Sequence, residues 1–354
     1  MLTYAVPGLD HESWDNLHQL ANCLIEHGTK PLGDTSRGRV IALVGAGASV
    51  PAGIPASKQL KEKIQEIVIN GGLIHEEALK RELNKPLSMA SLEEFTQVAC
   101  KYLHVRDKVL AELNDICLAS PQSLNDSLPP LLCYEILAHL VKHGFIDHVI
   151  SMNFDEILDE ALENEVGREA LFRIVSEQDL IGFTELPPYK AGLVKPHGTI
   201  SLPRSLRFTR ENVAMFPAEI ADFIQKEILI SHSNKPSHFP QTTLVVVGFS
   251  MHDLEINRIL SEATLAQIYR IDVTRPGSTV PNGFGETCTA GGESSLLRTL
   301  ERPIISAQGA NDIFSKLWEL MAEKAPEENL TLEPIAKHRL LSTIFQPSES
   351  LIFD

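Results

Sequence analysis

The sequence predicts an α/β fold in which a doubly wound parallel sheet carries an inserted helical subdomain. Apolar, strand-like runs alternate with amphipathic helical runs along most of the chain. Two of the strands end in glycine turns, and a long stretch between the first two strands, residues 75–143, has a wholly helical pattern. With 354 residues, the chain is long enough to bury a full core.

The first clear strand covers Arg39–Val44, which is apolar throughout after Arg39, as a central parallel strand should be. Before it, residues 1–38 predict an N-terminal helical segment, with the helix around Trp14–His27 and a polar connector behind it. After it, a helix is expected from about Ala56 to Ile69, closed by the turn Asn70-Gly71-Gly72.

The helical stretch at about 75–143 has its clearest start signal at Ser91-Leu92-Glu93-Glu94, which resembles a capping box. So long a helical stretch between two strands suggests an inserted subdomain or lid. The strand and helix alternation then resumes, and we expect a hairpin region at residues 199–209 and a helix at residues 254–267. Residues 325–354 are predicted to be a polar tail.

The formal net charge of −16 argues against a protein that binds nucleic acid directly. Such binding depends on a basic surface, and no run of Lys or Arg longer than two residues is present. A local basic patch is left open. The acidity itself is explained by solubility.

The chain has no stretch of about 18 consecutive apolar residues, so we expect no membrane span. The N-terminus lacks the pattern of a secretory signal. The five cysteines are odd in number and far apart, so they predict neither a disulfide framework nor a CxxC zinc knuckle. These features together predict a cytoplasmic protein.

The turn after the first strand, Gly45-Ala46-Gly47-Ala48-Ser49, is the strongest single signal. A strand, a glycine turn and a helix N-terminus direct backbone N–H groups and the helix dipole at an anion. Gly45 allows the tight turn, and Gly47 allows the backbone to approach a dinucleotide phosphate.

The loop nevertheless departs from the standard phosphate-binding fingerprints. Val50 stands where the third glycine of G-x-G-x-x-G would be, and no acidic residue ends a second strand about 20 residues on, so the dehydrogenase pattern is not met. A Walker A loop is excluded because no Gly-Lys-Ser/Thr follows. The motif can also be no more than a tight strand-to-helix turn.

Three other segments place polar side chains at the carboxyl ends of predicted strands, where open α/β sheets bind ligands. They are Ser151-Met152-Asn153-Phe154-Asp155, Lys195-Pro196-His197-Gly198 and Gly248-Phe249-Ser250-Met251-His252-Asp253. Each of these segments can also have a purely structural role. Asn153 or Asp155 could cap the following helix, as could Asp253. His197 is one of 13 histidines, of which any single one is more often structural than catalytic.

The order of these motifs, GAGAS-x-x-AGIP, MNFD, KPHG and GFS-x-x-D, resembles the sirtuin-type (SIR2) family. In particular it resembles the bacterial SIR2-like NAD hydrolases of anti-phage defence. The resemblance runs from about Val40 to Val273, and it implies a Rossmann-like NAD-binding domain at residues 39–324 with the helical insertion inside it.

The resemblance implies a role for each motif. Asn153 and Asp155 would lie at the nicotinamide ribose, and His197 would be the catalytic base. Ser49 would lie on the pyrophosphate side, and Gly248 and Ser250 near the adenosine half. The NAD-binding residues implied are Gly45, Ala46, Gly47, Ser49, Gly53, Ile54, Pro55, Gly248, Ser250 and Asp272.

The sequence differs from the protein-deacylating sirtuins at several positions, and these differences indicate which branch of the family it resembles. Protein-deacylating sirtuins carry a four-cysteine zinc module, whereas residues 198–248 contain no cysteine, and no metal is expected here. Ala56-Ser57-Lys58 replaces Asp-Phe-Arg, and Met152 replaces the glutamine before the asparagine. The favoured function is therefore an NAD+ hydrolase that releases nicotinamide and ADP-ribose, with NAD+ as its substrate.

Two alternatives remain, a protein deacylase or ADP-ribosyltransferase, and a non-catalytic scaffold that binds NAD or ADP-ribose. The intact set of Asn153, Asp155 and His197 argues against the scaffold. A homo-oligomer is expected. By resemblance, the expected partner is a HerA-type ATPase or a short Argonaute.

Overall fold

The computed structural model describes residues 9–31, 37–118, 132–184, 190–213, 215–229, 241–251, 253–273, 299–306 and 309–325. The predicted C-terminal tail, residues 325–354, lies outside this part of the chain except for its first residue. Among the described residues, no helix has the length and apolar character needed to cross a membrane.

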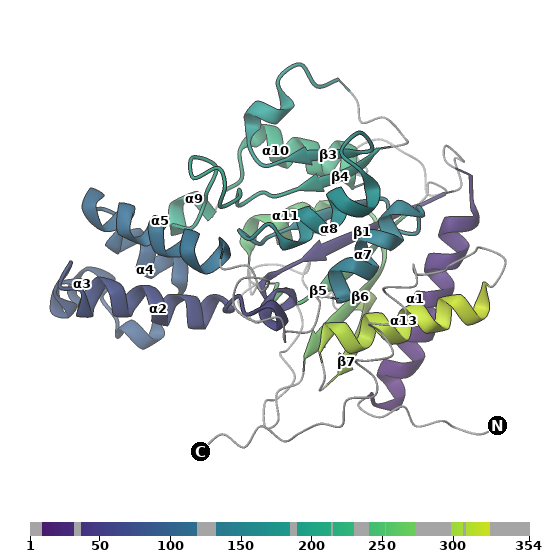
Figure 1. Ribbon diagram of the computed structural model, residues 1–354, viewed down its shortest axis with the longest axis horizontal. Helices are drawn as coiled ribbons and strands as arrows, with labels where there is room; N and C mark the ends of the chain where they lie inside the picture. Colours follow the sequence, from purple (N-terminus) through teal and green to yellow (C-terminus); the bar gives the residue numbers. More distant parts are fainter. Residues whose placement is uncertain are drawn as a thin grey trace.

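A seven-stranded sheet forms the centre of the described molecule, and all its strands are parallel (Figure 1). The strand order is β3-β4-β2-β1-β5-β6-β7, so the chain changes direction across the sheet between β1 and β5. The strands are β1 (Arg39–Val44), β2 (His148–Ser151), β3 (Leu171–Ile174), β4 (Ala191–Val194), β5 (Thr242–Val247), β6 (Leu265–Val273) and β7 (Glu301–Ser306). This arrangement confirms the predicted Rossmann-like, doubly wound sheet.

The central strands are those with the longest apolar runs. Every residue of β5 is buried, and so is every residue of β1 after Arg39. A central parallel strand is covered by helices on both faces, which explains why these two strands show no polar alternation.

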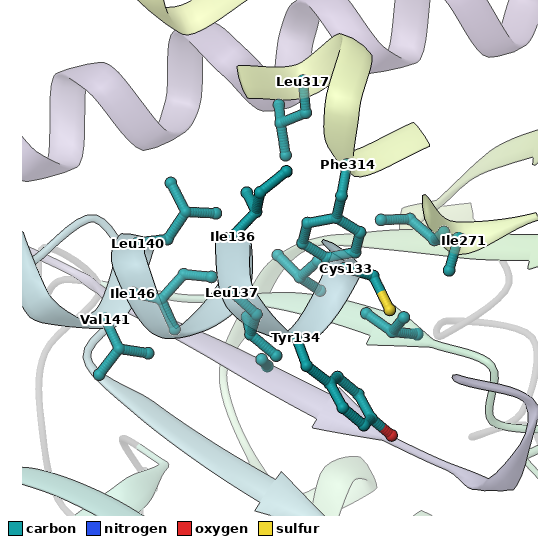
Figure 2. Packing of buried hydrophobic residues seen from close by; sticks show 14 of the residues in the cluster. Cys133, Tyr134, Ile136, Leu137, Leu140, Val141, Ile146, Ile271, Phe314 and Leu317 are labelled. Carbon is teal, nitrogen blue, oxygen red and sulfur yellow. The ribbon is translucent and has the colours of Figure 1, made fainter. Parts of the chain in front are cut away.

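Helices cover the two faces of the sheet with separate apolar cores. In Figure 2, Phe314 and Leu317 pack over Ile136 and Leu140 on one face. This face carries α1 (His11–Thr29), α7 (Leu132–Lys142), α8 (Ile157–Val166) and α13 (Ala310–Lys324). The opposite face carries α10 (Ala218–Phe223), the π-helical turn Ile224–Ile228 and α11 (Leu254–Glu262).

A helical module with its own core extends to one side of the sheet, at the left of Figure 1. It consists of α2 (Ser57–Asn70), α3 (Glu76–Leu83), α4 (Leu92–Ala99) and α5 (Leu103–Leu118). The capping box predicted at α4 is present: Ser91 Oγ accepts from the N–H of Glu94, and the Glu94 carboxylate accepts from the N–H of Ser91. Short helical turns complete the described chain: η1 (Ala46–Ala48), η2 (Val50–Ala52), η3 (Leu87–Met89), η4 (Glu177–Leu180) and α9 (Arg210–Val213).

The helices that pack together in the module are not the same as those in the insertion predicted at residues 75–143. Helix α7 falls within that range, yet its side chains belong to the core of the sheet. Helix α2 precedes the range, but Leu60, Ile64 and Val68 pack in the core of the module. We therefore place the module at residues 57–118.

Two other expectations were wrong. Residues 199–209 form successive turns instead of a hairpin, because backbone groups bond locally, as in Leu202 N–H to Thr199 O and Ser205 N–H to Leu202 O. The helix expected at 254–267 ends at Glu262, because Leu265 already pairs with Thr242 as the start of β6.

Candidate active site

A cleft of about 970 Å³ opens at the carboxyl ends of the central strands, between the sheet and the helical module. Ligands of open α/β sheets bind at this edge, beside the point where the strand order reverses. The residues predicted for the site that line the cleft are Ala46, Gly47, Ile54, Pro55, Asn153, Asp155, His197, Gly248, Ser250 and Asp272. Three predicted residues do not line it: Gly45, Ser49 and Gly53.

The glycine loops after β1 and β5 meet beside this cleft. The N–H of Gly47 donates to the carbonyl oxygen of Gly248 at 2.8 Å. A Cβ on Gly47 would lie 2.8 Å from that oxygen, and a Cβ on Gly248 would lie 2.3 Å from the backbone nitrogen of Ala48. Gly248 also has a φ of +59°, in the left-handed region. Contact between the two loops therefore requires glycine at both positions.

This contact changes the interpretation of the first glycine loop. The sequence suggested that Gly47 is small so that a phosphate can approach, whereas in the structure the group that approaches Gly47 is the loop after β5. The turns η1 and η2 also separate β1 from α2, so the N-terminus of α2 does not directly follow the glycine turn. Gly53 ends η2 with a φ of +85°, and a Cβ on this residue would meet no atom within 4 Å.

Asn153 lies in a buried hydrogen-bond network behind the first glycine loop. Its Nδ2 donates to the carbonyl of Gly45 and to Ser49 Oγ at 3.1 Å each, and contacts the hydroxyl of Tyr134 at 3.2 Å. Its Oδ1 is buried and has no hydrogen-bond partner in the described part of the chain. An unpaired buried acceptor is costly, so Asn153 Oδ1 is suited to accept from a ligand hydroxyl or a water.

Ser49 is fully buried, and its hydroxyl bonds to protein groups. It donates to Asp155 Oδ2 at 2.9 Å and lies 2.7 Å from the hydroxyl of Tyr134. In Figure 2 the hydroxyl of Tyr134 points away from Phe314 and Leu317, toward this network. Ser49 therefore supports the site from behind, whereas the resemblance assigned it to the pyrophosphate.

Asp155 is buried, and both of its carboxylate oxygens have partners. Oδ2 accepts from Ser49, and Oδ1 accepts from the N–H of Ile157 at 3.3 Å in the first turn of α8. The alternative interpretation of this residue as a helix cap thus describes one of its two contacts. Burial raises the pKa of Asp155, and the positive charge of Lys195 opposes that rise.

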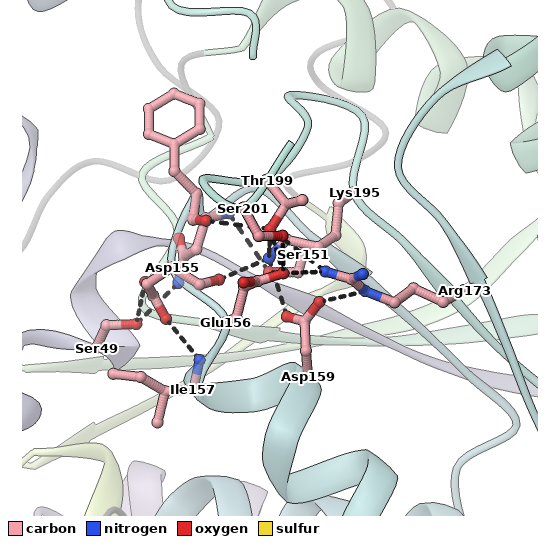
Figure 3. Close-up of polar contacts among 12 residues, drawn as sticks. Ser49, Ser151, Asp155, Glu156, Ile157, Asp159, Arg173, Lys195, Thr199 and Ser201 are labelled. Carbon is pink, nitrogen blue, oxygen red and sulfur yellow. Dashed lines mark hydrogen bonds and ion pairs between the residues drawn. The ribbon is translucent and has the colours of Figure 1, made fainter. Parts of the chain in front are cut away.

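Lys195 is fully buried at the end of β4 and joins two loops of the site (Figure 3). Its Nζ donates to the backbone carbonyl of Asp155 at 2.6 Å, to Asp159 Oδ2 at 2.9 Å and to Thr199 Oγ1 at 3.2 Å. Asp159 is also bound by Arg173, whose Nε lies 2.7 Å from Oδ1. The ammonium therefore holds the loop after β2 against the loop after β4.

His197 forms an ion pair or hydrogen bond with Asp253, at 2.9 Å between Nε2 and Oδ2. The rings of Phe154 and Phe216 contact the imidazole edge-on. Its Nδ1 is buried and has no hydrogen-bond partner among the described residues. When Nε2–H donates to the carboxylate of Asp253, Nδ1 is the unprotonated nitrogen and can accept a proton.

Sequence reasoning missed three residues that organise the site. Asp253 was considered only as a cap of α11, a role it also has, and its distance from His197 in the chain concealed the pairing. Lys195 stood out only as part of the motif around His197. Tyr134 gave no signal, because it lies in the apolar run of α7.

Comparison with known families agrees with this geometry. Residues 147–270 match the family model of the SIR2-like domain. The chain carries a SIR2-like domain. The match spans β2 to β6 and includes Asn153, Asp155, His197, Gly248 and Ser250. None of the curated proteins compared with the chain matches it significantly.

A SIR2-like domain implies the use of NAD+, and the cleft is consistent with a dinucleotide in two respects. Its volume is near the upper end of the range for small-molecule sites. It also runs from the loop after β4 across the switch point to the end of β6, which gives an extended ligand contacts along its length.

Proposed function

We propose that the SIR2-like domain hydrolyses NAD+ to nicotinamide and ADP-ribose. The observation that carries this proposal is a pair of buried atoms, Asn153 Oδ1 and His197 Nδ1, that have no hydrogen-bond partner among the described residues and belong to side chains lining one cleft. An asparagine oxygen can accept from a ribose hydroxyl or from water, and an unprotonated imidazole nitrogen can take a proton.

The reaction breaks the bond between C1 of the ribose and the ring nitrogen of nicotinamide. The electron pair of this bond leaves with nicotinamide, which becomes neutral and needs no general acid. The ribose carbon gains positive charge as the bond breaks, and a water oxygen then bonds to it. The proton that this water loses passes to His197, which releases it to solvent.

Asp155 acts in this proposal through its charge and through its contacts. Both carboxylate oxygens are already bonded, so it fixes Ser49 and, through Ser49, the orientation of Asn153. Its buried negative charge also favours the cationic transition state, because electrostatic stabilisation is strong where water is excluded.

One feature of the amino-acid sequence favours hydrolysis over protein deacylation. Residues 198–248 contain no cysteine with which to build the zinc module of deacylating sirtuins.

The test measures nicotinamide release from NAD+ by chromatography, with and without an acylated peptide. We expect release without the peptide, and a decrease of about 10²-fold or more in Asn153→Ala and His197→Ala, the range of a lost acid–base group. His104→Ala, an exposed histidine outside the cleft, is the matched control. Equal turnover in all variants would refute the residue assignment, and release only with the peptide would favour a deacylase.

We further propose that this activity serves anti-phage defence by depleting NAD+, in a homo-oligomer that acts with a HerA-type ATPase or a short Argonaute. The resemblance of the four motifs to defence-type NAD hydrolases supports this role. In infected cells, NAD+ should fall with the wild-type protein and stay constant with Asn153→Ala. An NAD+ level that is unaffected by infection would argue against it.

A further inference from the structure

The loop that follows His197 is built into the core of the helical module. Ile200, Leu206 and Phe208 are buried, with 1%, 5% and 4% of their surface exposed. They pack in one apolar core with side chains of α2, α4 and α5. The loop after β2 reaches the same core, because Phe154 packs against it. Both loops that carry the proposed site residues are therefore anchored in the module as well as in the sheet.

Hydrogen bonds close this loop directly behind His197. The N–H of Arg207 donates to the carbonyl oxygen of His197 at 2.9 Å, and the N–H of Thr199 donates to Ser205 Oγ at 3.0 Å. Gly198 has a φ of +79°, and a Cβ on it would lie 2.2 Å from the carbonyl oxygen of Ser205. So compact a loop deforms little, and a displacement of its far end is passed to the histidine.

Thr96 on α4 makes a polar contact between the module and the far end of the loop. Its side chain is fully buried, and Oγ1 donates to the carbonyl oxygen of Phe208 at 2.5 Å. The same hydroxyl lies 2.9 Å from the carbonyl oxygen of Leu92 and 3.2 Å from that of Glu93, both within its own helical segment. A hydroxyl has one proton to donate, and the shortest of the three contacts is the one to the loop.

We propose that the helical module positions His197, with Thr96 as a positioning residue that acts through the loop at residues 198–208. This inference rests on the proposed function, in which His197 takes a proton from water. Proton transfer needs donor and acceptor within hydrogen-bond reach, so a small displacement of the imidazole slows the chemical step. Thr96 lies outside residues 147–270, the part of the chain that matches the SIR2-like domain.

The first test is a comparison of two variants at Thr96. Thr96→Val nearly keeps the shape of the side chain and removes the hydroxyl, whereas Thr96→Ser keeps the hydroxyl. For nicotinamide release we expect kcat to fall about tenfold in Thr96→Val, with KM changed by less than about twofold, and to recover in Thr96→Ser.

Val68→Ala is the matched control for a general loss of module stability. Val68 is fully buried in the same core, on α2, about 15 Å along the helix from Lys58 at the cleft. The substitution should lower the thermal stability and leave kcat unchanged.

Histidine side-chain NMR reports on His197 whether or not NAD+ is turned over, and its signal is identified by its absence in His197→Ala. The signal should move in Thr96→Val, return in Thr96→Ser and stay in place in Val68→Ala. Ile200→Val is the second variant, in case Thr96→Val does not fold as judged by its thermal melt. It removes one methyl group from the contact between loop and module, and it should also move the signal.

An unmoved signal in the folded variants, an unchanged kcat in Thr96→Val, or an equal change in Val68→Ala overturns the inference. A signal that responds as expected, in a protein that releases no nicotinamide from NAD+, supports the inference and refutes the proposed function.

Discussion

Asp253 uses its two carboxylate oxygens for two different purposes. Oδ1 accepts from the N–H groups of Glu255 and Ile256 and caps α11, while Oδ2 contacts His197 Nε2 at 2.9 Å. The start of a helix on one side of the sheet switch point thus orients an imidazole held on the other side. A carboxylate in this position also fixes the tautomer of the histidine.

Asp253→Asn separates the two purposes. Asparagine caps helices about as well as aspartate, so the free energy of unfolding should change by less than about 1 kcal/mol. The negative charge that favours Nε2–H and stabilises the imidazolium is lost, so NAD+ turnover should fall by about 10²-fold. Nicotinamide release and urea unfolding measure the two effects, and an unchanged turnover would show that Asp253 only caps α11.

At the scale of elements, the loops after β1 and β5 form one unit. The N–H of Gly47 donates to the carbonyl oxygen of Gly248. Because neither residue has a side chain, backbone atoms of each loop lie where a Cβ on the other loop's glycine would be. Neighbouring parallel strands at a switch point bring such loops together, which is why both ends carry glycine motifs.

Comparing the stability of Gly248→Ala with that of Gly53→Ala tests how tightly the two loops pack. Both glycines have a positive φ, so alanine is strained at each by about 1 kcal/mol or more. Only at Gly248 does the new Cβ also meet backbone, at 2.3 Å from Ala48 N, whereas Gly53 has open space. Gly248→Ala should therefore lose about 1–3 kcal/mol more than Gly53→Ala in urea unfolding. Equal losses would show that the loops can separate at no cost.

At the scale of the whole molecule, acid stability depends on a histidine far from the cleft. His148 begins β2, is buried, and accepts from the N–H of Gly192 in β4 at 2.9 Å between N and Nδ1. Burial lowers the pKa of His148 to about 4 from the ordinary 6.5. The folded state therefore needs this imidazole neutral.

This shift predicts how stability depends on pH. The contribution of His148 is fully present above pH 6.5 and is lost as the pH falls from 6.5 toward about 4, by at most about 3 kcal/mol. His148→Asn keeps an acceptor near the Nδ1 position but does not titrate, so its stability should fall less between pH 7.5 and pH 4.5. Urea unfolding at both values checks this. His104→Asn, at an exposed histidine, is the control and should behave like wild type.

Much of the sheet could be predicted because each strand is marked by a local run of apolar or β-branched residues. Arg39–Val44 is found as predicted, and residues 243–247, a run of mostly β-branched residues, lie in β5. Boundaries between packing units could not be predicted in this way. Helix α2 buries one narrow stripe of its surface, whereas α7 is buried on nearly all sides. Neither pattern names the surface against which the helix packs, and only that surface assigns α2 to the module and α7 to the sheet.

The sequence alone determined the sheet and the gathering of Asn153, His197 and Gly248 at one edge, because the ends of parallel strands converge wherever a doubly wound sheet forms. It also determined the absence of a cysteine cluster between residues 198 and 248. Only the tertiary structure decided which of these side chains have partners. It paired His197 with Asp253 and enclosed Ser49 behind the glycine loop. Such contacts join residues far apart in the chain, and their formation depends on distances that no local pattern encodes.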